Sequence, residues 1–356
     1  MNFFTSLYQK YRTSSVSYLK EAIKENDELL MPGWYIINQP FARKIGSDLP
    51  DAVKVDYPYL LKPKSAKGFL LNLMALLFCM KRVSQPPVNA NRKSYSLIYR
   101  SAKGDLKMFD LKRNVILVRF QSPSKLNRVK EFYSSNQYLP LNMIQFESGN
   151  RYTEPVINGV PSFYASDHIQ LELYRNLLER FIGKIDEIKK NNFSIFWNVG
   201  EANDFFERNI RHIESEDLVS KMNARKSFIE ACAVSCPLIF THGDLSSSNI
   251  LINGKEYVVI DYEHSSLRHL FHDIINLPFN GMIVGSETVY DRHNFVLNFR
   301  DELELMMDKL SVSDGVQLQD LIYIHILQRA ADGNPYNAEA SSRAVNELLP
   351  CLEKSM

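Results

Sequence analysis

Two short stretches of the chain, joined by a tight turn, constrain its fold more than any other feature. The first is His242-Gly243-Asp244-Leu245, with Asn249 five residues after its aspartate. The second is the apolar run Val258–Ile260, which is followed by Asp261. Between them the dipeptide Asn253-Gly254 favours a two-residue hairpin turn. The pattern predicts a short β-hairpin with two carboxylates and one amide at its open end, where strands hold polar groups firmly.

The three polar side chains at this hairpin suit the transfer of a phosphoryl group from ATP to a hydroxyl. That reaction needs a carboxylate to orient the hydroxyl and accept its proton, and it needs oxygen ligands for Mg²⁺. We assign the first task to Asp244 and the binding of Mg²⁺ to Asn249 and Asp261. Protein kinases space these residues in the same way. The predicted cofactors are therefore ATP and Mg²⁺.

The same residues resemble the phosphotransferase branch of the kinase-like fold, which includes aminoglycoside phosphotransferases, choline and ethanolamine kinases, and related sugar kinases. The likeness rests on His-Gly-Asp-Leu in place of His-Arg-Asp-Leu. It continues in Ile260–His264 and Phe271–Asn276, which are similar to the Ile-Asp-Tyr-Glu and Phe-Asp-Ile-x-Asn patterns of choline kinases. The resemblance implies that His242 and Asp273 support the catalytic loop. No long activation segment fits between Asp261 and Asp273, which favours a small-molecule kinase.

The resemblance also implies an α+β, bilobal protein-kinase-like fold, with a small antiparallel β-sheet in the amino-terminal lobe and a mainly helical carboxy-terminal lobe. A chain of 356 residues has room for two such lobes. We expect a helical or irregular extension over 1–90, the amino-terminal lobe over 91–158, and the carboxy-terminal lobe with the catalytic loop over 159–356. Apolar spacing predicts helices in the last region at 167–191, 204–216, 218–235, 301–310, 318–331 and 339–354.

The resemblance assigns nucleotide contacts to a strand of the amino-terminal lobe and to the hinge, which is the segment that joins the two lobes. The family carries a phosphate-binding Lys on the third strand, where this chain has Arg119. Arg119 either binds phosphate, with Glu131 of the following helix as its partner, or is a surface charge at a sheet edge. At the hinge the expected contacts to adenine come from Glu154, Val156 and Ile157. The proline between the first two has no N–H to donate.

Composition limits the partners and the compartment. A net charge of +1 gives no general attraction to nucleic acid or to anionic membranes. Four scattered cysteines and the absence of a secretory signal pattern predict a cytoplasmic protein. A helix is expected over 14–24. The apolar run 68–80 is too short to span a bilayer, so it predicts a buried helix. The alternative is a peripheral contact at the inner membrane face through 62–82.

Signals for the acceptor point in two directions. The first 90 residues hold 12 Lys and Arg against 7 Asp and Glu, which favours a sugar or saccharide precursor at the membrane face. From Glu287 onward the chain has 12 Asp and Glu but only 6 Lys and Arg, and such an acidic region suits an amino alcohol or an amino sugar. Tyr290, Tyr323 and Tyr336 are candidates for an aromatic box around such a cation. We favour the sugar hydroxyl. A kinase-fold protein that binds nucleotide without catalysis is the third alternative.

Overall fold

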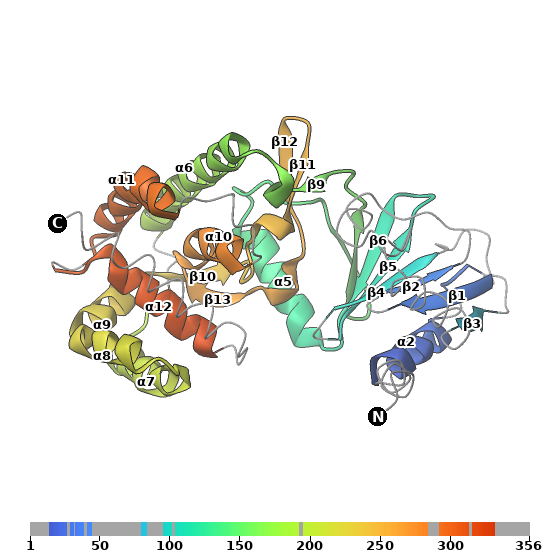
Figure 1. Cartoon of the computed structure of the whole chain (residues 1–356), viewed down its shortest axis with the longest axis horizontal. Helices are drawn as coiled ribbons and strands as arrows, with labels where there is room; N and C mark the ends of the chain where they lie inside the picture. The colour runs from blue at the N-terminus through green and yellow to red at the C-terminus, as the bar shows by residue number, and fades with distance from the viewer. Residues whose placement is uncertain are drawn as a thin grey trace, which may run out of the picture. The chain divides into compact units, whose positions relative to one another are not determined.

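The computed structural model describes residues 14–26, 29–31, 33–38, 41–44, 80–83, 95–101, 104–191, 195–283, 292–312 and 315–331. Contacts within the chain divide it into two compact units (Figure 1). Unit 1 comprises Met1–Asn127 and Asn142–Val160, and unit 2 comprises Arg128–Leu141 and Pro161–Met356. Unit 1 is built on an antiparallel sheet and unit 2 is mainly helical. The predicted α+β class, with a sheet lobe and a helical lobe, is confirmed.

Unit 1 is organised around an eight-stranded sheet with the strand order β3-β1-β2-β4-β5-β6-β8-β7. Its strands are β1 (Gly33–Asn38), β2 (Phe41–Lys44), β3 (Met80–Val83), β4 (Leu97–Arg100), β5 (Leu106–Asp110), β6 (Val115–Arg119), β7 (Gln145–Glu147) and β8 (Arg151–Pro155). Neighbouring strands are antiparallel, and Met108 lies opposite both Ile98 and Leu117. These three side chains are buried in one cluster, because directly opposed residues of paired strands point to the same face.

Helix α2 (Ser14–Glu25) shares the core of this sheet and corresponds to the helix predicted over 14–24. Its Leu19 and Ile23 are buried in one cluster with Tyr35 and Ile37 of β1. The hydroxyl of Tyr35 donates to Tyr95 O at 2.9 Å, which ties β1 to the segment that precedes β4. Burial of these apolar side chains supplies the driving force that holds α2 against the sheet.

The described residues before position 90 differ from the helical or irregular extension expected there. Strands β1, β2 and β3 form one end of the sheet, and β2 pairs with β4 through Ala42 and Ile98. The apolar alternation of β1 spans only Tyr35 and Ile37, and much of the core that it joins, such as Ile98 and Met108, lies far along the chain. A pattern this short does not identify a sheet strand from the sequence. The boundaries at 90 and 158 stay predictions.

Part of the predicted organisation falls outside the described residues. This applies to 62–79, which contains most of the apolar run, and to the helix at 339–354. Met80, the last residue of the run, is described and begins β3. In the part of the chain that the structure describes, no helix is both long and apolar enough to cross a membrane.

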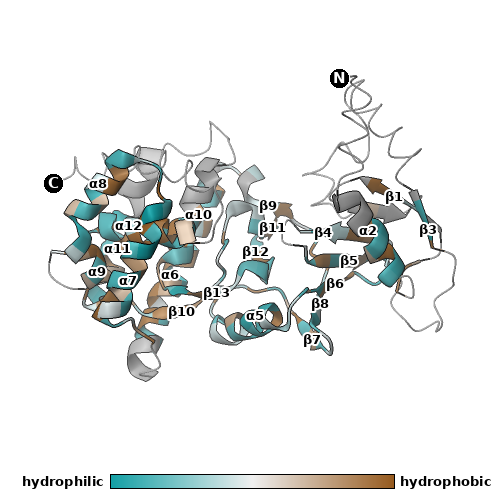
Figure 2. Cartoon of the chain, turned by 90° about the horizontal axis from the view of Figure 1, so that it is seen from below, coloured by the Kyte–Doolittle hydropathy of each residue, from teal (hydrophilic) through white to brown (hydrophobic). Residues whose placement is uncertain are grey.

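Unit 2 packs helices around two short sheets. Its helices are α6 (Asp167–Asn191), α7 (Val199–Asn209), α8 (Glu216–Ala224), α9 (Lys226–Ser235), α10 (His272–Ile283), α11 (Arg292–Leu310) and α12 (Leu318–Ala331), and α5 (Pro123–Ser135) enters it from unit 1. Hydrophobic and hydrophilic residues lie side by side on these helices (Figure 2), as expected for amphipathic helices around a shared core. Helix α12 lies deep in this core, since every residue from Asp320 to Arg329 is buried.

A buried ion pair divides the single helix predicted over 218–235 into α8 and α9. Arg225 lies between them with φ −110° and ψ 12°, outside the helical range. Its guanidinium donates to both carboxylate oxygens of Asp320, Nε to Oδ1 at 2.7 Å and Nη2 to Oδ2 at 2.6 Å. The Asp320 side chain is fully buried. A buried carboxylate needs such a paired cation, and this requirement prevails over helix continuity at Arg225.

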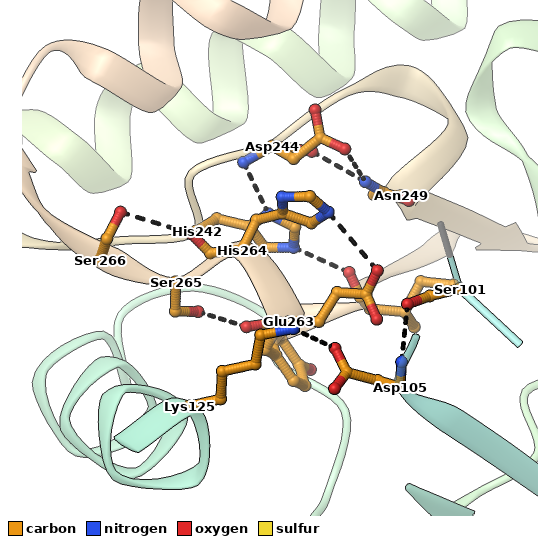
Figure 3. Close-up of polar contacts among 12 residues, drawn as sticks. Ser101, Asp105, Lys125, His242, Asp244, Asn249, Glu263, His264, Ser265 and Ser266 are labelled. Atoms are coloured by element: carbon orange, nitrogen blue, oxygen red, sulfur yellow. Dashed lines mark hydrogen bonds and ion pairs between the residues drawn. The ribbon is translucent and has the colours of Figure 1, made fainter. Parts of the chain in front are cut away.

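A second buried carboxylate closes the turn between β4 and β5. The side chain of Asp105 is fully buried and pairs with Nζ of Lys125 at the start of α5 (Figure 3). Its Oδ1 also accepts the backbone N–H of Gln121 at 3.2 Å, while Ser101 N donates to Asp105 O at 2.9 Å. One carboxylate thereby joins the turn to the segment between β6 and α5.

We expect Asp105→Ala to lower the free energy of unfolding by about 3 kcal/mol, because it leaves the Lys125 ammonium and the Gln121 N–H without the buried carboxylate. The exposed ion pair of Asp217 with Lys221 supplies the control. Asp217→Ala should cost less than about 1 kcal/mol. Chemical denaturation followed by circular dichroism measures both. Equal effects of the two substitutions would contradict the structural role of Asp105.

Candidate active site

The predicted hairpin is present in unit 2. Strand β10 (Leu238–Thr241) leads into the loop 242–246, and a 3₁₀ turn at Ser247–Asn249 leads into β11 (Ile250–Asn253). β11 pairs with β12 (Glu256–Val259), so that Asn253 lies opposite Glu256 across the turn. Strand β13 (Ser266–His269) pairs with β10. The loop is therefore anchored at both ends by strands whose backbone hydrogen bonds limit its movement.

Asp244 and Asn249 lie together at the mouth of the hairpin (Figure 3). The amide Nδ2 of Asn249 donates to Asp244 O at 2.8 Å and lies 3.4 Å from Asp244 Oδ2. Since a carbonyl oxygen only accepts, the amide nitrogen must face Asp244. This orientation leaves Oδ1 of Asn249 as the atom that a cation would bind. The Asp244 side chain is 34% exposed, which leaves its carboxylate accessible to a substrate.

Asp261 adopts a left-handed backbone conformation, with φ 69° and ψ 61°. For a residue with a Cβ this conformation costs about 1–2 kcal/mol. It is held by neighbouring hydrogen bonds: Ile260 N donates to Asn249 O at 3.0 Å, and the Tyr262 hydroxyl donates to Val259 O at 2.6 Å. Backbone strain of this kind persists at functional positions that the surrounding structure determines. The first of these bonds joins the backbone of Asn249 to the residue before Asp261.

Asp273 at the start of α10 binds the catalytic loop through its backbone. Its Oδ2 accepts the N–H of His242 at 2.6 Å and its Oδ1 accepts the N–H of Gly243 at 2.9 Å. Burial raises the pKa of Asp273 above its ordinary value, while His242, the two amide hydrogen bonds and the charge of Arg268 act in the opposite direction. These contacts are what the predicted loop-supporting role requires.

Gly243 passes so close to the next segment that a side chain does not fit. Its φ is +80°, and a Cβ at this position would lie 2.3 Å from the backbone oxygen of His264. The glycine that replaces the arginine of the His-Arg-Asp-Leu pattern is therefore required by backbone geometry here.

The buried ring of His242 joins the loop to the strand end that precedes Asp261. Its Nε2 lies 2.8 Å from Ile260 O, and its Nδ1 lies 3.3 Å from the backbone N of Asp244. Because a carbonyl accepts and an N–H donates, Nε2 carries the proton and Nδ1 accepts. Both ring nitrogens are thus used within the protein.

Three residues that sequence reasoning did not assign also contact the loop. Arg268 Nη1 donates to Gly243 O at 2.9 Å, and Asn276 Nδ2 donates to Leu245 O at 3.0 Å. Arg329 Nη1 lies 3.7 Å from Asp244 Oδ1. Asn276 falls within the choline-kinase-like pattern, whereas the two arginines belong to segments where an isolated charge normally indicates a solvent-facing side chain.

The side chains predicted to contact nucleotide are divided between the two units. Arg119 lies exposed on β6, where its Nη1 donates to Asn26 Oδ1 at 3.0 Å. Glu154 is buried, and its Oε2 accepts from Asn142 Nδ2 at 3.3 Å. Glu131 is exposed on α5 and belongs to unit 2. Its pairing with Arg119 therefore stays a prediction.

At the hinge, the backbone N–H of Val156 donates to Asn114 O at 2.9 Å. An adenine contact through this N–H would have to replace that bond. Ile157, the other predicted donor, is half-buried directly after it. Of the two amides, that of Ile157 is the better candidate for a contact with the base.

The aromatic residues considered for a cation box do not form one within the described residues. Tyr323 is 2% exposed inside α12, so its ring faces the core. Tyr262, next to the predicted metal ligand, is also fully buried and packs against Phe132 at a centroid distance of 5.6 Å. Tyr290 and Tyr336 lie outside the described residues.

Comparisons with known proteins agree with the motif. Residues 170–301, which contain the whole of the predicted catalytic centre, match the phosphotransferase enzyme family, so the resemblance drawn from the sequence is confirmed. No curated protein sequence matches the chain.

Solved structures that match include two kinases and an aminoglycoside phosphotransferase. A glucosamine kinase bound to glucosamine, ADP and inorganic phosphate is 11% identical over 72% of this chain and 81% of its own, with a TM-score of 0.45. A thermostable mutant of aminoglycoside phosphotransferase APH(4)-Ia is 12% identical over 74% and 96%, with a TM-score of 0.45. Choline kinase from Cryptosporidium parvum is 14% identical over 72% and 89%, with a TM-score of 0.43. At these values the likeness says nothing about the acceptor.

Three buried histidines around the site predict a loss of stability in acid. Burial lowers the pKa of His269 to about 4 and holds those of His272 and His325 well below the ordinary value of 6.5, with the charges of Arg268 and Arg329 adding to the effect on the last two. The unfolded chain therefore binds more protons below about pH 6.5. The stability that these groups contribute is complete above that pH and is lost as pH falls.

As the pH is lowered from 6.5 to 5, we expect the free energy of unfolding to fall by at most about 4 kcal/mol per pH unit. Each of the three histidines contributes about 1.4 kcal/mol per pH unit to this slope. His269→Gln keeps a donor for the Cys236 carbonyl and should reduce this slope by about a third. The exposed His212 supplies the control, because His212→Gln should leave the slope unchanged. Urea unfolding at several pH values measures it. A pH-independent wild type would contradict the assignment.

Proposed function

We propose that this protein transfers the γ-phosphoryl group of ATP to a hydroxyl of a small molecule, and that the acceptor is a sugar or saccharide precursor. The observation that carries the proposal is the joint placement of Asp244 and Asn249 by one hydrogen bond. Asp261 follows Ile260, whose N–H donates to Asn249 O, and has a strained backbone. Strands and buried polar contacts hold all three, as a reaction that depends on positioning requires.

Asp244 is the general base in this proposal. Its carboxylate accepts the proton of the acceptor hydroxyl as the hydroxyl oxygen forms a bond to the γ-phosphorus. The bond between that phosphorus and the bridging oxygen breaks, and ADP leaves with the electron pair. His242 contributes by fixing the backbone N–H of Asp244 through its Nδ1. Binding and orientation of the reactants account for most of the rate enhancement that such an enzyme achieves.

The residues present fit a magnesium site. Mg²⁺ prefers hard oxygen ligands and keeps several waters, so one or two protein ligands suffice beside phosphate oxygens. Asn249 offers its amide oxygen, because its nitrogen is committed to Asp244 O. Asp261 offers a carboxylate, and together these residues would hold the ion. When bound, Mg²⁺ neutralises negative charge on the triphosphate.

Two observations favour a neutral acceptor over an amino alcohol or an aminoglycoside. Arg329 places a positive charge 3.7 Å from the Asp244 carboxylate, which disfavours a second cation there. Asp320 and Tyr323, from the acidic and aromatic carboxy-terminal region, are buried within α12. Neither side chain is presented to a cationic ligand. An amino alcohol or amino sugar whose charge lies away from the reacting hydroxyl is the alternative acceptor.

A nucleotide-binding protein without catalysis is the alternative from another class. The departure that favours it is Arg119, which stands in for the phosphate-binding lysine and donates to Asn26. Retention of Asp244, Asn249 and Asp261 with their supporting hydrogen bonds favours the enzyme. A cytoplasmic location also stays a proposal. It is supported by Cys232 and Cys236, which are free thiols with sulfurs 3.8 Å apart.

The proposal predicts Mg²⁺-dependent ADP release from ATP in the presence of one member of a panel of sugars, amino sugars and amino alcohols. Asp244→Asn should lower kcat by about 10²–10⁴, because it removes the base and leaves the fold intact. Asp261→Asn should weaken Mg²⁺-dependent ATP binding, measured by calorimetry. Asp204→Asn, at an exposed position on α7, serves as the control. ATP binding with no turnover on any acceptor would favour the nucleotide-binding protein.

A further inference from the structure

We propose that Arg329 of α12 is a positioning residue for the catalytic carboxylate of Asp244. This inference rests on the proposed phosphotransferase function and adds to it a residue from a segment outside the motif. Arg329 Nη1 lies 3.7 Å from Asp244 Oδ1. That separation is too long for a hydrogen bond and short enough for a strong charge interaction. The Arg329 side chain is 10% exposed and that of Asp244 34%, so solvent screens the pair only in part.

The carboxylate of Asp244 has a different partner on each oxygen. Oδ1 faces Arg329, while Oδ2 lies 3.4 Å from Asn249 Nδ2. A group held from both sides cannot rotate about its χ2 without losing one partner. The acceptor hydroxyl must meet one particular oxygen in line with the phosphorus, so a fixed carboxylate plane contributes directly to the rate.

Helix α12 is suited to deliver a side chain to a fixed place. Near its start, the carboxylate of Asp320 accepts two hydrogen bonds from Arg225. Near its end, Gln328 Oε1 accepts from Nδ1 of the buried His272 at 3.0 Å. Apolar residues such as Leu327, which is fully buried, fill the space between. A helix that is held near both ends and buried from Asp320 to Arg329 keeps Arg329 at a constant distance from the loop.

The loop itself supplies no cation beside Asp244. Ser246, the second residue after the catalytic aspartate, directs its hydroxyl to Ser248 at an oxygen–oxygen distance of 2.8 Å. Arg268 is close, but its Nη1 donates to Gly243 O and lies beside His272 Nε2. Arg268 also acts on the buried carboxyl of Asp273. The charge of Arg329 therefore balances Asp244 while that of Arg268 balances Asp273.

The test compares Arg329→Met, Arg329→Lys and the control Lys309→Met in the full-length protein. Lys309 is a partly buried cation of α11 whose Nζ lies 2.6 Å from Asp186 Oδ1, so its loss removes an ion pair of unit 2 that does not involve the loop. The readouts are kcat and the KM for ATP, both from Mg²⁺-dependent ADP release. The assay is run with the acceptor identified from the panel and, separately, with water as the acceptor.

We expect Arg329→Met to lower kcat about 10- to 100-fold with the KM for ATP changed less than threefold, because carboxylate orientation is lost while ATP contacts remain. Arg329→Lys should restore most of kcat, and Lys309→Met should leave kcat unchanged. Adding Arg329→Met to Asp244→Asn should lower kcat no further, since Arg329 acts through Asp244. An unchanged kcat in Arg329→Met, or a further loss in the double variant, would overturn the proposal.

Failure of the proposed function is distinguishable from failure of this inference. A wild type that consumes no ATP with any acceptor refutes the phosphotransferase function alone. The pairing of Arg329 with Asp244 is then judged from thermal unfolding. The Tm is measured for the wild type, for Arg329→Met, for Asp244→Asn and for the double variant. A Tm shift of the double variant that differs from the sum of the two single shifts supports the pair, because either single substitution already removes the shared interaction. Additive shifts overturn it.

Discussion

Asp273 accepts the backbone N–H groups of both His242 and Gly243, and the other contacts of the catalytic loop build on this pairing. With its own amide held, His242 sets its ring between the backbone of Asp244 and the carbonyl of Ile260. One buried carboxylate thus helps to position both the loop that carries Asp244 and the strand end that precedes Asp261. Burying it is costly, and charge-assisted bonds to the two amides offset much of that cost.

The site tolerates little change in its backbone. Gly243 runs against His264 with no room for a Cβ, and Asp261 is held in a left-handed conformation by hydrogen bonds on either side of it. Such a site cannot adapt to its substrates by local rearrangement. For a reaction in which the protein contributes mainly position and charge, this rigidity is an advantage.

Unit 2 supports the loop with segments that come after it in the chain. Strand β13 supplies Arg268, helix α10 supplies Asp273 and Asn276, and α12 brings Arg329 to the carboxylate of Asp244. Buried guanidinium groups thereby act on both Asp244 and Asp273. The histidines packed among these charges remain neutral, because burial and the nearby arginines both disfavour their protonation.

The sequence by itself determined the hairpin, the fold class and helices such as 167–191 and 318–331, because that information is local. The base and the metal ligands that it indicates stay predictions. A turn dipeptide, a run of apolar residues and a five-residue spacing are read within one stretch of chain. Only the tertiary structure decided that residues before 90 extend the sheet, that Arg225 breaks a helix to meet Asp320, and that Arg329 reaches Asp244. Each of these depends on a buried charge or strand edge finding a partner far along the chain, and no local pattern specifies that partner.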